Sequence, residues 1–302
     1  MIRIIKYRRI FLTISALLVL TSILSLIFIG FKPGIDFTGG TLMEIEFKKS
    51  RPDIVLIREK LDSLDLGIAS VQPAAEKGII IRAKDLNNEQ RNKILKTLEK
   101  DFKDTGKVTE LRFESIGPSV GKDLKNKAII AVVLASICMI LYIAYVFRKM
   151  SSTVSSWKMA ACAILALVHD ILIVCGIFVL LGYFMGVEID VLFVSALLVV
   201  LGYSVNDTIV VFDRIRDNVL KDPSIDLEVN AELSINQTLV RSLATGMTTL
   251  LVLLSLYLFG GQTIQWFIFA LIIGIIIGSY SSIFVASCLL VEWEKWDKRR
   301  SS

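Results

Sequence analysis

Histidine and cysteine, which supply many metal ligands, are scarce in this sequence of 302 residues. It contains one histidine, His169, which excludes a multi-histidine metal centre and the HExxH arrangement of zinc proteases. All four cysteines fall inside apolar runs, where they act as small hydrophobic side chains: Cys138, Cys162, Cys175 and Cys288. We therefore expect no disulfide, no metal site and no cofactor.

Proline and net charge are also low. The five prolines all lie outside the long apolar runs, as expected if those runs are uninterrupted helices: Pro33, Pro52, Pro73, Pro118 and Pro223. The net charge is only +5, and the basic residues flank the apolar runs instead of forming one patch. This distribution argues against nucleic-acid binding and is typical of the loops of a membrane protein.

A phosphate-binding loop is missing as well. Segment 117–123 is superficially similar to one, but its spacing is one residue short and Asp123 replaces the serine or threonine. This excludes nucleotide binding. We expect no enzymatic activity, and any work that the protein does must draw on an ion gradient or on a partner.

Long apolar runs are abundant: 54% of the residues are hydrophobic, and the mean hydropathy is +0.65. A helix that crosses a membrane needs about 20 apolar residues. The runs predict a polytopic α-helical membrane protein with six transmembrane helices, at 10–31 and about 127–147, 159–183, 191–212, 239–259 and 264–291. The first run is longer than the apolar part of a signal peptide, and we interpret it as an uncleaved anchor.

Residues 32–126, between the first two runs, have the composition of a soluble domain. Alternating apolar and polar residues, as in 41–47, predict strands, and apolar residues spaced three and four apart predict two amphipathic helices. The predicted order β-α-β-β-α-β is that of a ferredoxin-like α+β domain. Many unrelated proteins contain this domain, so it indicates no function by itself.

Loop charges predict how the helices are oriented. The loops after the second, fourth and sixth runs are basic, whereas the links 182–190 and 260–263 contain no lysine or arginine. The basic residues are Arg148, Lys149, Lys158, Arg214, Arg216, Lys221, Lys295, Lys298, Arg299 and Arg300. By the positive-inside rule, both termini (1–9 and 292–302) are expected in the cytoplasm and the domain 32–126 outside it.

A few ionisable residues lie inside the predicted membrane helices. They are His169 and Asp170 in the third helix, Asp207 beside Asn206 in the fourth, and Arg241 in the fifth. Each such group costs about 2.5–3.5 kcal/mol at the bilayer centre on insertion scales, so it usually faces a partner or a wet cavity. The fourth and fifth helices run in opposite directions, which places Asp207 and Arg241 in the same half of the membrane.

These residues suggest a proton relay. An aspartate that alternates between pairing with a permanently charged arginine and binding a proton is a simple relay element. Four threonines share a helical face around Arg241, where their hydroxyl groups can hold water: Thr238, Thr245, Thr248 and Thr249.

Other interpretations of these residues stay open. The long side chain of Arg241 can reach the membrane interface instead, and Asp207 can have a purely structural hydrogen-bonding role. His169 and Asp170 form either a buried structural pair or a second titrating element. The motif Gly274-x-x-x-Gly278 in the last helix indicates close helix packing, within the chain or with a partner.

Four segments resemble signature motifs of the SecD/SecF family. They are Gly34-Ile-Asp36-Phe-Thr-Gly39-Gly40-Thr41 after the first run, residues 117–124 before the second, and residues 202–216 and 236–241. The resemblance covers essentially the whole chain. The single soluble domain and the pair Asn206-Asp207 favour the SecF branch over SecD or a fused SecDF.

The resemblance implies an RND-like membrane fold in the bacterial inner membrane. It also implies assembly with SecD, with the SecYEG translocon and with YajC, and use of the proton-motive force to complete preprotein translocation. Within it, Asp207 and Arg241 match residues assigned to proton transport, and Asp170 matches a feature whose role is less settled. The alternatives are an RND-type efflux transporter of small molecules or lipids, and a structural subunit in which SecD alone conducts ions.

Overall fold

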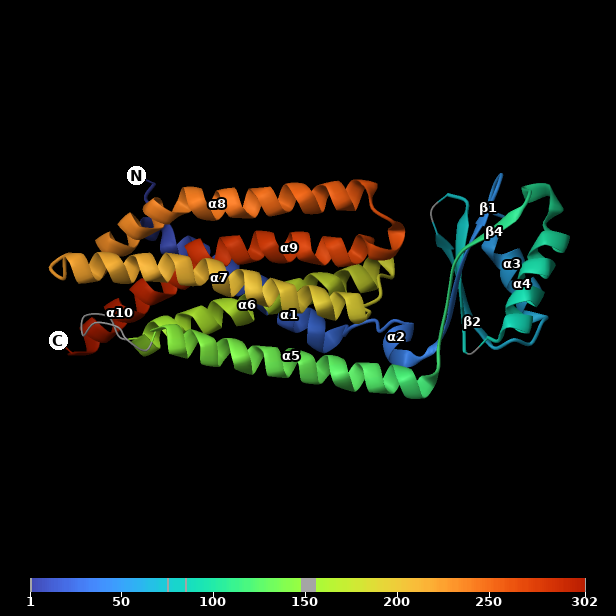
Figure 1. Ribbon diagram of the computed structural model, residues 1–302, viewed down its shortest axis with the longest axis horizontal. Coiled ribbons are helices and arrows are strands. Elements are labelled where there is room, and N and C mark those ends of the chain that lie inside the picture. The colour runs from blue at the N-terminus through green and yellow to red at the C-terminus, as the bar shows by residue number, and fades with distance from the viewer. Residues whose placement is uncertain (1, 75, 85, 148–155, 302) are drawn as a thin grey trace. The chain divides into compact units, whose positions relative to one another are not determined.

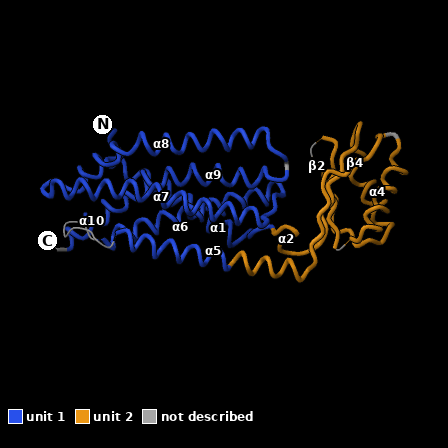
Figure 2. Tube along the Cα trace, viewed as in Figure 1, with its two compact units in different colours: residues 1–32, 130–302 blue, residues 33–129 orange. Residues whose placement is uncertain are grey.

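The computed structural model describes residues 2–74, 76–84, 86–147 and 156–301. The chain forms two compact units, which Figure 2 shows in different colours: unit 1, residues 1–32 and 130–302, and unit 2, residues 33–129. Two residues that entered the orientation prediction, Arg148 and Lys149, lie outside the described part.

Unit 2 contains one antiparallel sheet and two main helices. Its elements are the short helix α2 (Ile35–Thr38), then β1 (Gly40–Phe47), α3 (Ile54–Asp62), β2 (Ile68–Ala74), β3 (Gly78–Ala83), α4 (Asn88–Asp101), the 3-10 turn η2 (Lys103–Thr105) and β4 (Val108–Ile116). The strand order is β2-β3-β1-β4, and each neighbouring pair is antiparallel. This is the topology of a ferredoxin-like domain, so the predicted fold of the soluble domain is confirmed.

Alternation along β1 explains how this unit buries its core. Met43, Ile45 and Phe47 are fully buried, whereas Glu46 is exposed on the other side of the strand. Helices α3 and α4, which Figure 1 shows on one side of the sheet, each contribute two buried residues one turn apart: Ile57, Leu61, Ile94 and Leu98. Hydrophobic burial therefore joins the two helices to the sheet.

Within the described residues, the structure has six helices that are long and apolar enough to cross a membrane, as predicted. They are η1–α1 (Ile5–Tyr7 and Arg8–Phe28), α5 (Pro118–Val146), α6 (Ser156–Met185), α7 (Val191–Lys221), α8 (Leu227–Phe259), and a sixth span formed by α9 (Gln265–Ser281), η5 (Ser282–Ala286) and α10 (Ser287–Ser301). A 3-10 turn, η4 (Gln262–Ile264), precedes the sixth span. In Figure 1 the helices of unit 1 lie side by side, and both termini are at the same end, called here the terminal end.

Two features of these helices differ from what the sequence indicates. The polar segment 227–235 lies outside the predicted membrane helices, but in the structure it is the continuous first part of α8. A tight turn separates it from α7: the hydroxyl and the N–H of Ser224 donate to Asp222, which lowers the pKa of that carboxyl. The sixth span is interrupted by a π-helical turn at Ser282–Ala286.

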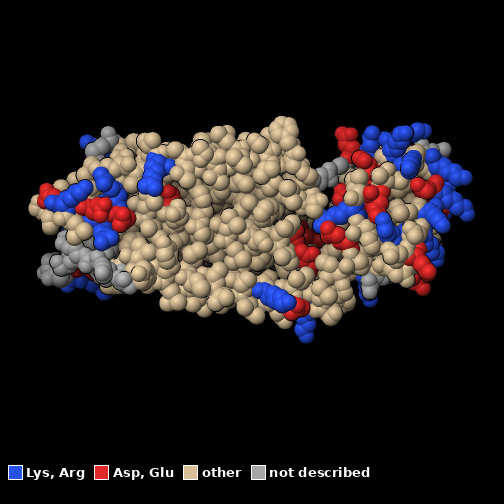
Figure 3. Space-filling model, viewed as in Figure 1, with Lys and Arg blue, Asp and Glu red and all other residues tan. Residues whose placement is uncertain are grey.

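The helices differ in how deeply they are buried. In α6, α7 and the sixth span about half of the apolar segment is buried, whereas in α5 only 6% of it is buried. Figure 3 shows an almost uncharged surface over much of unit 1, and charged side chains gathered at the terminal end. This is the surface expected of helices that lie in lipid or against other membrane helices.

The sixth span and α7 approach each other closely at the Gly274-x-x-x-Gly278 motif. A Cβ atom at Gly274 would lie 2.1 Å from Cγ2 of Val200, and one at Gly278 would lie 3.2 Å from Cβ of Ser204. The motif therefore packs within the chain, where the absence of side chains allows the two backbones to come together.

Candidate functional site: two buried carboxylates

Asp207 lies where three helical segments meet. It is 8% exposed, and its two carboxylate oxygens accept hydrogen bonds from different elements. Ser242 on α8 donates to Oδ1 over 2.7 Å, and Ser282 at the start of η5 donates to Oδ2. The aspartate of α7 is thus held by hydroxyl groups of two other membrane helices.

Asp170, one helix away on α6, is a second buried carboxylate. It is fully buried, and Nδ1 of His169 lies 2.8 Å from its Oδ1 atom. Oδ2 accepts from the hydroxyl groups of Ser204 on α7 and of Ser281 on α9, the latter over 2.7 Å. Three donors on three helices therefore satisfy this carboxylate, as a buried charged or polar group requires.

The imidazole of His169 is only partly satisfied. Its Nε2 atom is buried and has no hydrogen-bond partner among the described residues. On one side its ring stacks with Tyr280 at 6.5 Å between centroids. A buried ring nitrogen with no partner is uncommon and marks a place where water or a proton can be accommodated.

The structure places Arg241 elsewhere. Its side chain is exposed on α8, and among the described residues it has no ion pair with Asp207. Successive residues of a helix point about 100° apart, so Ser242, by turning toward Asp207, turns Arg241 away from it. Asn206 and Thr245 are exposed as well, and the hydroxyl of Thr245 donates to the carbonyl of Arg241 in its own helix.

Sequence reasoning missed the four serines that contact the carboxylates: Ser204, Ser242, Ser281 and Ser282. A signal was available for two of them. Ser204 precedes Asp207 by three residues and therefore shares its helical face, and Ser242 follows Arg241 directly. The pairing of Ser281 and Ser282 with two different helices depends on tertiary packing, which the sequence pattern does not give.

The residues of the Gly34–Thr41 motif form a close backbone contact in unit 2. Gly34 is the N-cap of α2 and Asp36 lies within it, and Gly39 and Gly40 follow with φ angles of +71° and +118°. A Cβ atom at Gly39 would lie 2.8 Å from Cα of Pro118 at the start of α5. Two of the four segments that resemble family motifs therefore pack against each other, and the contact requires glycine.

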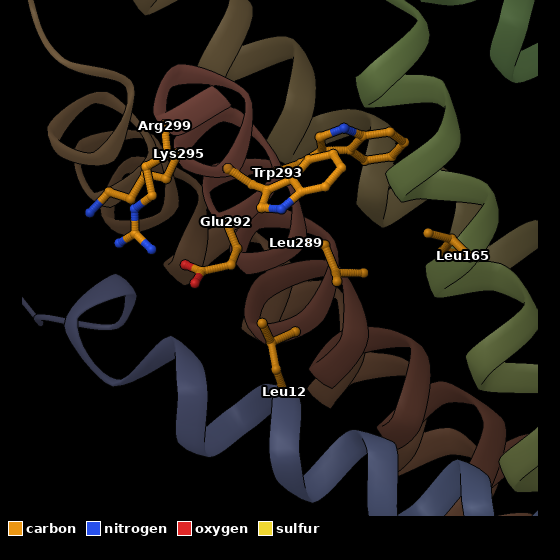
Figure 4. Close-up of a pocket in the computed structure, with 8 residues that line it drawn as sticks. Leu12, Leu165, Leu289, Glu292, Trp293, Lys295 and Arg299 are labelled. Atoms are coloured by element: carbon orange, nitrogen blue, oxygen red, sulfur yellow. The ribbon is translucent and has the colours of Figure 1, made fainter. Parts of the chain in front are cut away.

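The terminal end carries a network of ion pairs around a shallow pocket. Arg8 bonds to Glu228 over 2.9 Å and to Glu292 over 2.6 Å, and Lys295 also contacts Glu228. Figure 4 shows the charged residues on one side of this pocket and leucines toward its other side; its lining is Leu12, Leu165, Leu289, Glu292, Trp293, Lys295, Trp296 and Arg299. Tryptophan beside basic residues is typical of the level at which helices leave the bilayer.

The described residues offer no constellation for a metal. Nowhere in this part of the chain do three His, Cys, Asp or Glu side chains come together as a metal site requires. The chemistry that the arrangement supports is the binding and release of protons by carboxylates inside a helical bundle.

Comparison with known proteins identifies the family. Residues 96–296 match the model for the C-terminal region of SecD/SecF protein-export membrane proteins, and residues 24–50 match the SecD/SecF GG motif. The chain is 43% identical to the protein translocase subunit SecF of Thermobaculum terrenum, over 98% of this chain and 95% of that protein. It is 36% identical to the SecF subunit of Anaerolinea thermophila, over 99% of this chain and 98% of that protein.

A solved structure matches as well. The crystal structure of SecDF, a translocon-associated membrane protein from Thermus thermophilus, superposes with a TM-score of 0.82 at 32% identity. The match covers 97% of this chain but only 39% of that longer one. The chain therefore belongs to the SecD/SecF family of protein-export membrane proteins.

Proposed function

We propose that the chain works with SecD to couple the proton-motive force to the completion of preprotein translocation through SecYEG, and that Asp207 binds the transported proton. The observation that carries the proposal is the position of Asp207. It is a carboxylate inside the helical bundle, and hydroxyl groups from two other membrane helices hold it. The relatives named above are export subunits, so efflux of small molecules or lipids is not favoured.

The contacts of Asp207 suggest how proton binding changes helix packing. An ionised carboxylate accepts hydrogen bonds with both oxygens, whereas a protonated one must donate with one of them. Ser242 and Ser282 each donate to a different oxygen of Asp207. Protonation therefore requires at least one of these serines to accept a hydrogen bond instead of donating one, which changes the contact between its helix and α7. A proton gradient can thereby alternate the bundle between two packings.

Arg241 completes the relay in this proposal by facing the partner subunit. An arginine in a membrane helix is costly unless a partner or water meets it, and this one lies on an exposed face of α8. The fused SecDF of Brucella abortus supports SecD as that partner, because the match to this chain spans 34% of a single longer protein. YajC and the preprotein itself are further proposed partners.

The proposal includes an orientation. Basic residues cluster at the terminal end, where Lys295, Lys298, Arg299 and Arg300 lie in the last turns of α10. The positive-inside rule then assigns both termini to the cytoplasm and unit 2 to the outer side of the inner membrane.

The test is export into membrane vesicles with and without a proton gradient. We expect Asp207→Asn to assemble normally and to lose the gradient-dependent part of export, because the amide cannot bind a transported proton. The matched control is Asp213→Asn, which removes an exposed carboxylate from the same helix and should leave export unchanged. Full gradient-dependent export by Asp207→Asn would remove Asp207 from the mechanism.

A further inference from the structure

Two consecutive serines connect the two buried carboxylates. Ser281 donates to Asp170 on α6, and Ser282 donates to Asp207 on α7. Ser204 adds a second link, because it bonds to Asp170 and lies one turn from Asp207 on the same helix. Two adjacent residues of the sixth span therefore bind the two carboxylates, each through its own hydrogen bond.

The π-helical turn begins at this pair. Ser282 is the first residue of η5, and the hydroxyl of Ser287 donates to the carbonyl of Ser282 over 3.2 Å. A π-helical turn in an α-helix weakens the regular hydrogen-bond pattern and occurs frequently at functional sites. Here it lies where the sixth span contacts Asp170 and Asp207 from one short segment.

Each of the two serine hydroxyls has a second acceptor within reach. Oγ of Ser281 is 3.1 Å from the carbonyl oxygen of Gly278, and Oγ of Ser282 is 3.2 Å from that of Ser279. A hydroxyl group has one proton to donate and can also accept. It can donate to an ionised aspartate, or turn to the carbonyl and accept from the same aspartate once that is protonated.

We propose that Ser281 and Ser282 couple the protonation of Asp170 to that of Asp207, so that the His169–Asp170 pair is a second proton-binding station. This inference deepens the proposed function and rests on it. The proton that binds comes from water and returns to water. The serines keep their own protons and change only the group to which they donate.

The coupling has two physical sources. Two ionised carboxylates in a bundle of low dielectric constant repel each other, so the charge on one disfavours the charge on the other. The serines add a conformational link, because a shift of Ser281 that accompanies protonation of Asp170 moves the adjacent Ser282. The Nε2 atom of His169, which has no hydrogen-bond partner in the described part of the chain, offers the second station a further place for a proton.

Few other ionisable groups are present in the middle of the packed helices. Besides His169, Asp170 and Asp207, the described helices contribute three thiols here, Cys162 and Cys175 on α6 and Cys288 on α10. They also contribute two tyrosines, Tyr203 on α7 and Tyr280 on α9, and the exposed Arg241 on α8. The part of α1 that packs against these helices has hydroxyl groups, among them that of Ser15, which contacts the hydroxyl of Tyr280. In the middle of these described helices, Asp170 and Asp207 are therefore the only carboxyl groups.

The test is infrared difference spectroscopy of the full chain, assembled with SecD in lipid nanodiscs, over a pH titration. Asp207→Asn identifies the carboxyl band of Asp207 by its loss. We expect Asp170→Asn to shift the titration midpoint of that band by about half a pH unit or more, a change of about threefold in proton affinity. Ser281→Ala should also shift it, although Ser281 does not contact Asp207.

The matched control is Ser255→Ala, because the hydroxyl of Ser255 donates only to the carbonyl of Leu251 in its own helix. It should leave the midpoint of Asp207 unchanged. An unchanged midpoint in both Asp170→Asn and Ser281→Ala would overturn the inference, and Ser281→Ala alone decides it if Asp170→Asn does not assemble. The spectra do not depend on export. Failure of the coupling inference is therefore distinguishable from failure of the proposed function, because the vesicle assay of Asp207→Asn decides the latter.

Discussion

The length of a side chain decides how each ionisable residue of the membrane helices is satisfied. Asp207 is short and cannot reach the membrane surface, so its oxygens must find donors inside the bundle, and Ser242 and Ser282 provide them. Arg241 is long and lies on an exposed face of α8, where a partner or the interface can meet it. Asp207 and Arg241, which the sequence predicts to act as a pair, thus have different surroundings.

Gly39 has a backbone conformation that a larger residue cannot adopt without strain. Its φ and ψ angles of +71° and +169° are accessible almost only to glycine, and a Cβ would overlap the backbone of Pro118. We expect Gly39→Ala to destabilise unit 2 by about 1–3 kcal/mol from the backbone conformation, with a further cost from the overlap. Hydrogen exchange of the sheet amides in the full chain measures this loss as faster exchange in β1 and β4.

Gly67→Ala is the matched control for this prediction. Gly67 also has a positive φ, +63°, but a Cβ there would meet nothing within 4 Å. Gly67→Ala should therefore lower the stability of unit 2 only through its backbone conformation. If the two alanine variants exchange equally fast, the contact between Gly39 and Pro118 does not contribute to stability.

The elements show which parts of the structure a sequence pattern can give. The length of the apolar runs predicts the six membrane helices. The alternation of apolar and polar residues predicts the strands of the ferredoxin-like domain. Both patterns are properties of the local sequence. The sequence does not predict that α8 continues through 227–238, because that segment is polar. Contacts with residues remote in the sequence, such as that between Arg8 and Glu228, stabilise the helix there. The π-turn at Ser282–Ala286 was missed because it depends on the packing of the sixth span against α6 and α7.

The contact between α7 and α9 depends on Gly274. Gly274→Ala places a methyl group 2.1 Å from a methyl of Val200, so one helix must move. We expect a loss of about 1–3 kcal/mol, as for other overpacked cores. Thermal unfolding of the purified full chain measures it as a lower transition temperature.

A second substitution makes this prediction specific. Val200→Ala removes the clashing methyl groups, so the double variant should recover part of the loss, since residues in contact are energetically coupled. Gly202→Ala is the control, because a Cβ there would meet Cε of Met139 at an ordinary 3.7 Å. A transition temperature for Gly274→Ala as high as that of Gly202→Ala would contradict the close approach.

Unit 1 has faces of two kinds in the membrane. The exposed face of α5 is apolar and suited to lipid, with Ile137 and Leu141 among its exposed residues. The exposed surface of α8 is also largely apolar, with Leu243 and Met247 among its exposed residues, but one strip of it carries Arg241, Thr245 and Thr248. Polar groups on the outside of a membrane helix are costly against hydrocarbon, so this face is better suited to another protein than to lipid.

A bulky substitution tests whether SecD covers the face of α8 that carries Arg241. Thr248→Trp places a large ring on that face, and we expect it to reduce recovery of SecD with the tagged chain by tenfold or more, because two packed helices cannot accommodate the added volume. Ile137→Trp places the same ring on the exposed face of α5, where lipid adapts to it, and should leave recovery unchanged. Equal recovery of SecD with both variants, at equal amounts of folded chain, would exclude this face of α8 as the interface. The charge of Arg241 would then have to be met by water or lipid headgroups, and the proposed relay would lose its second member.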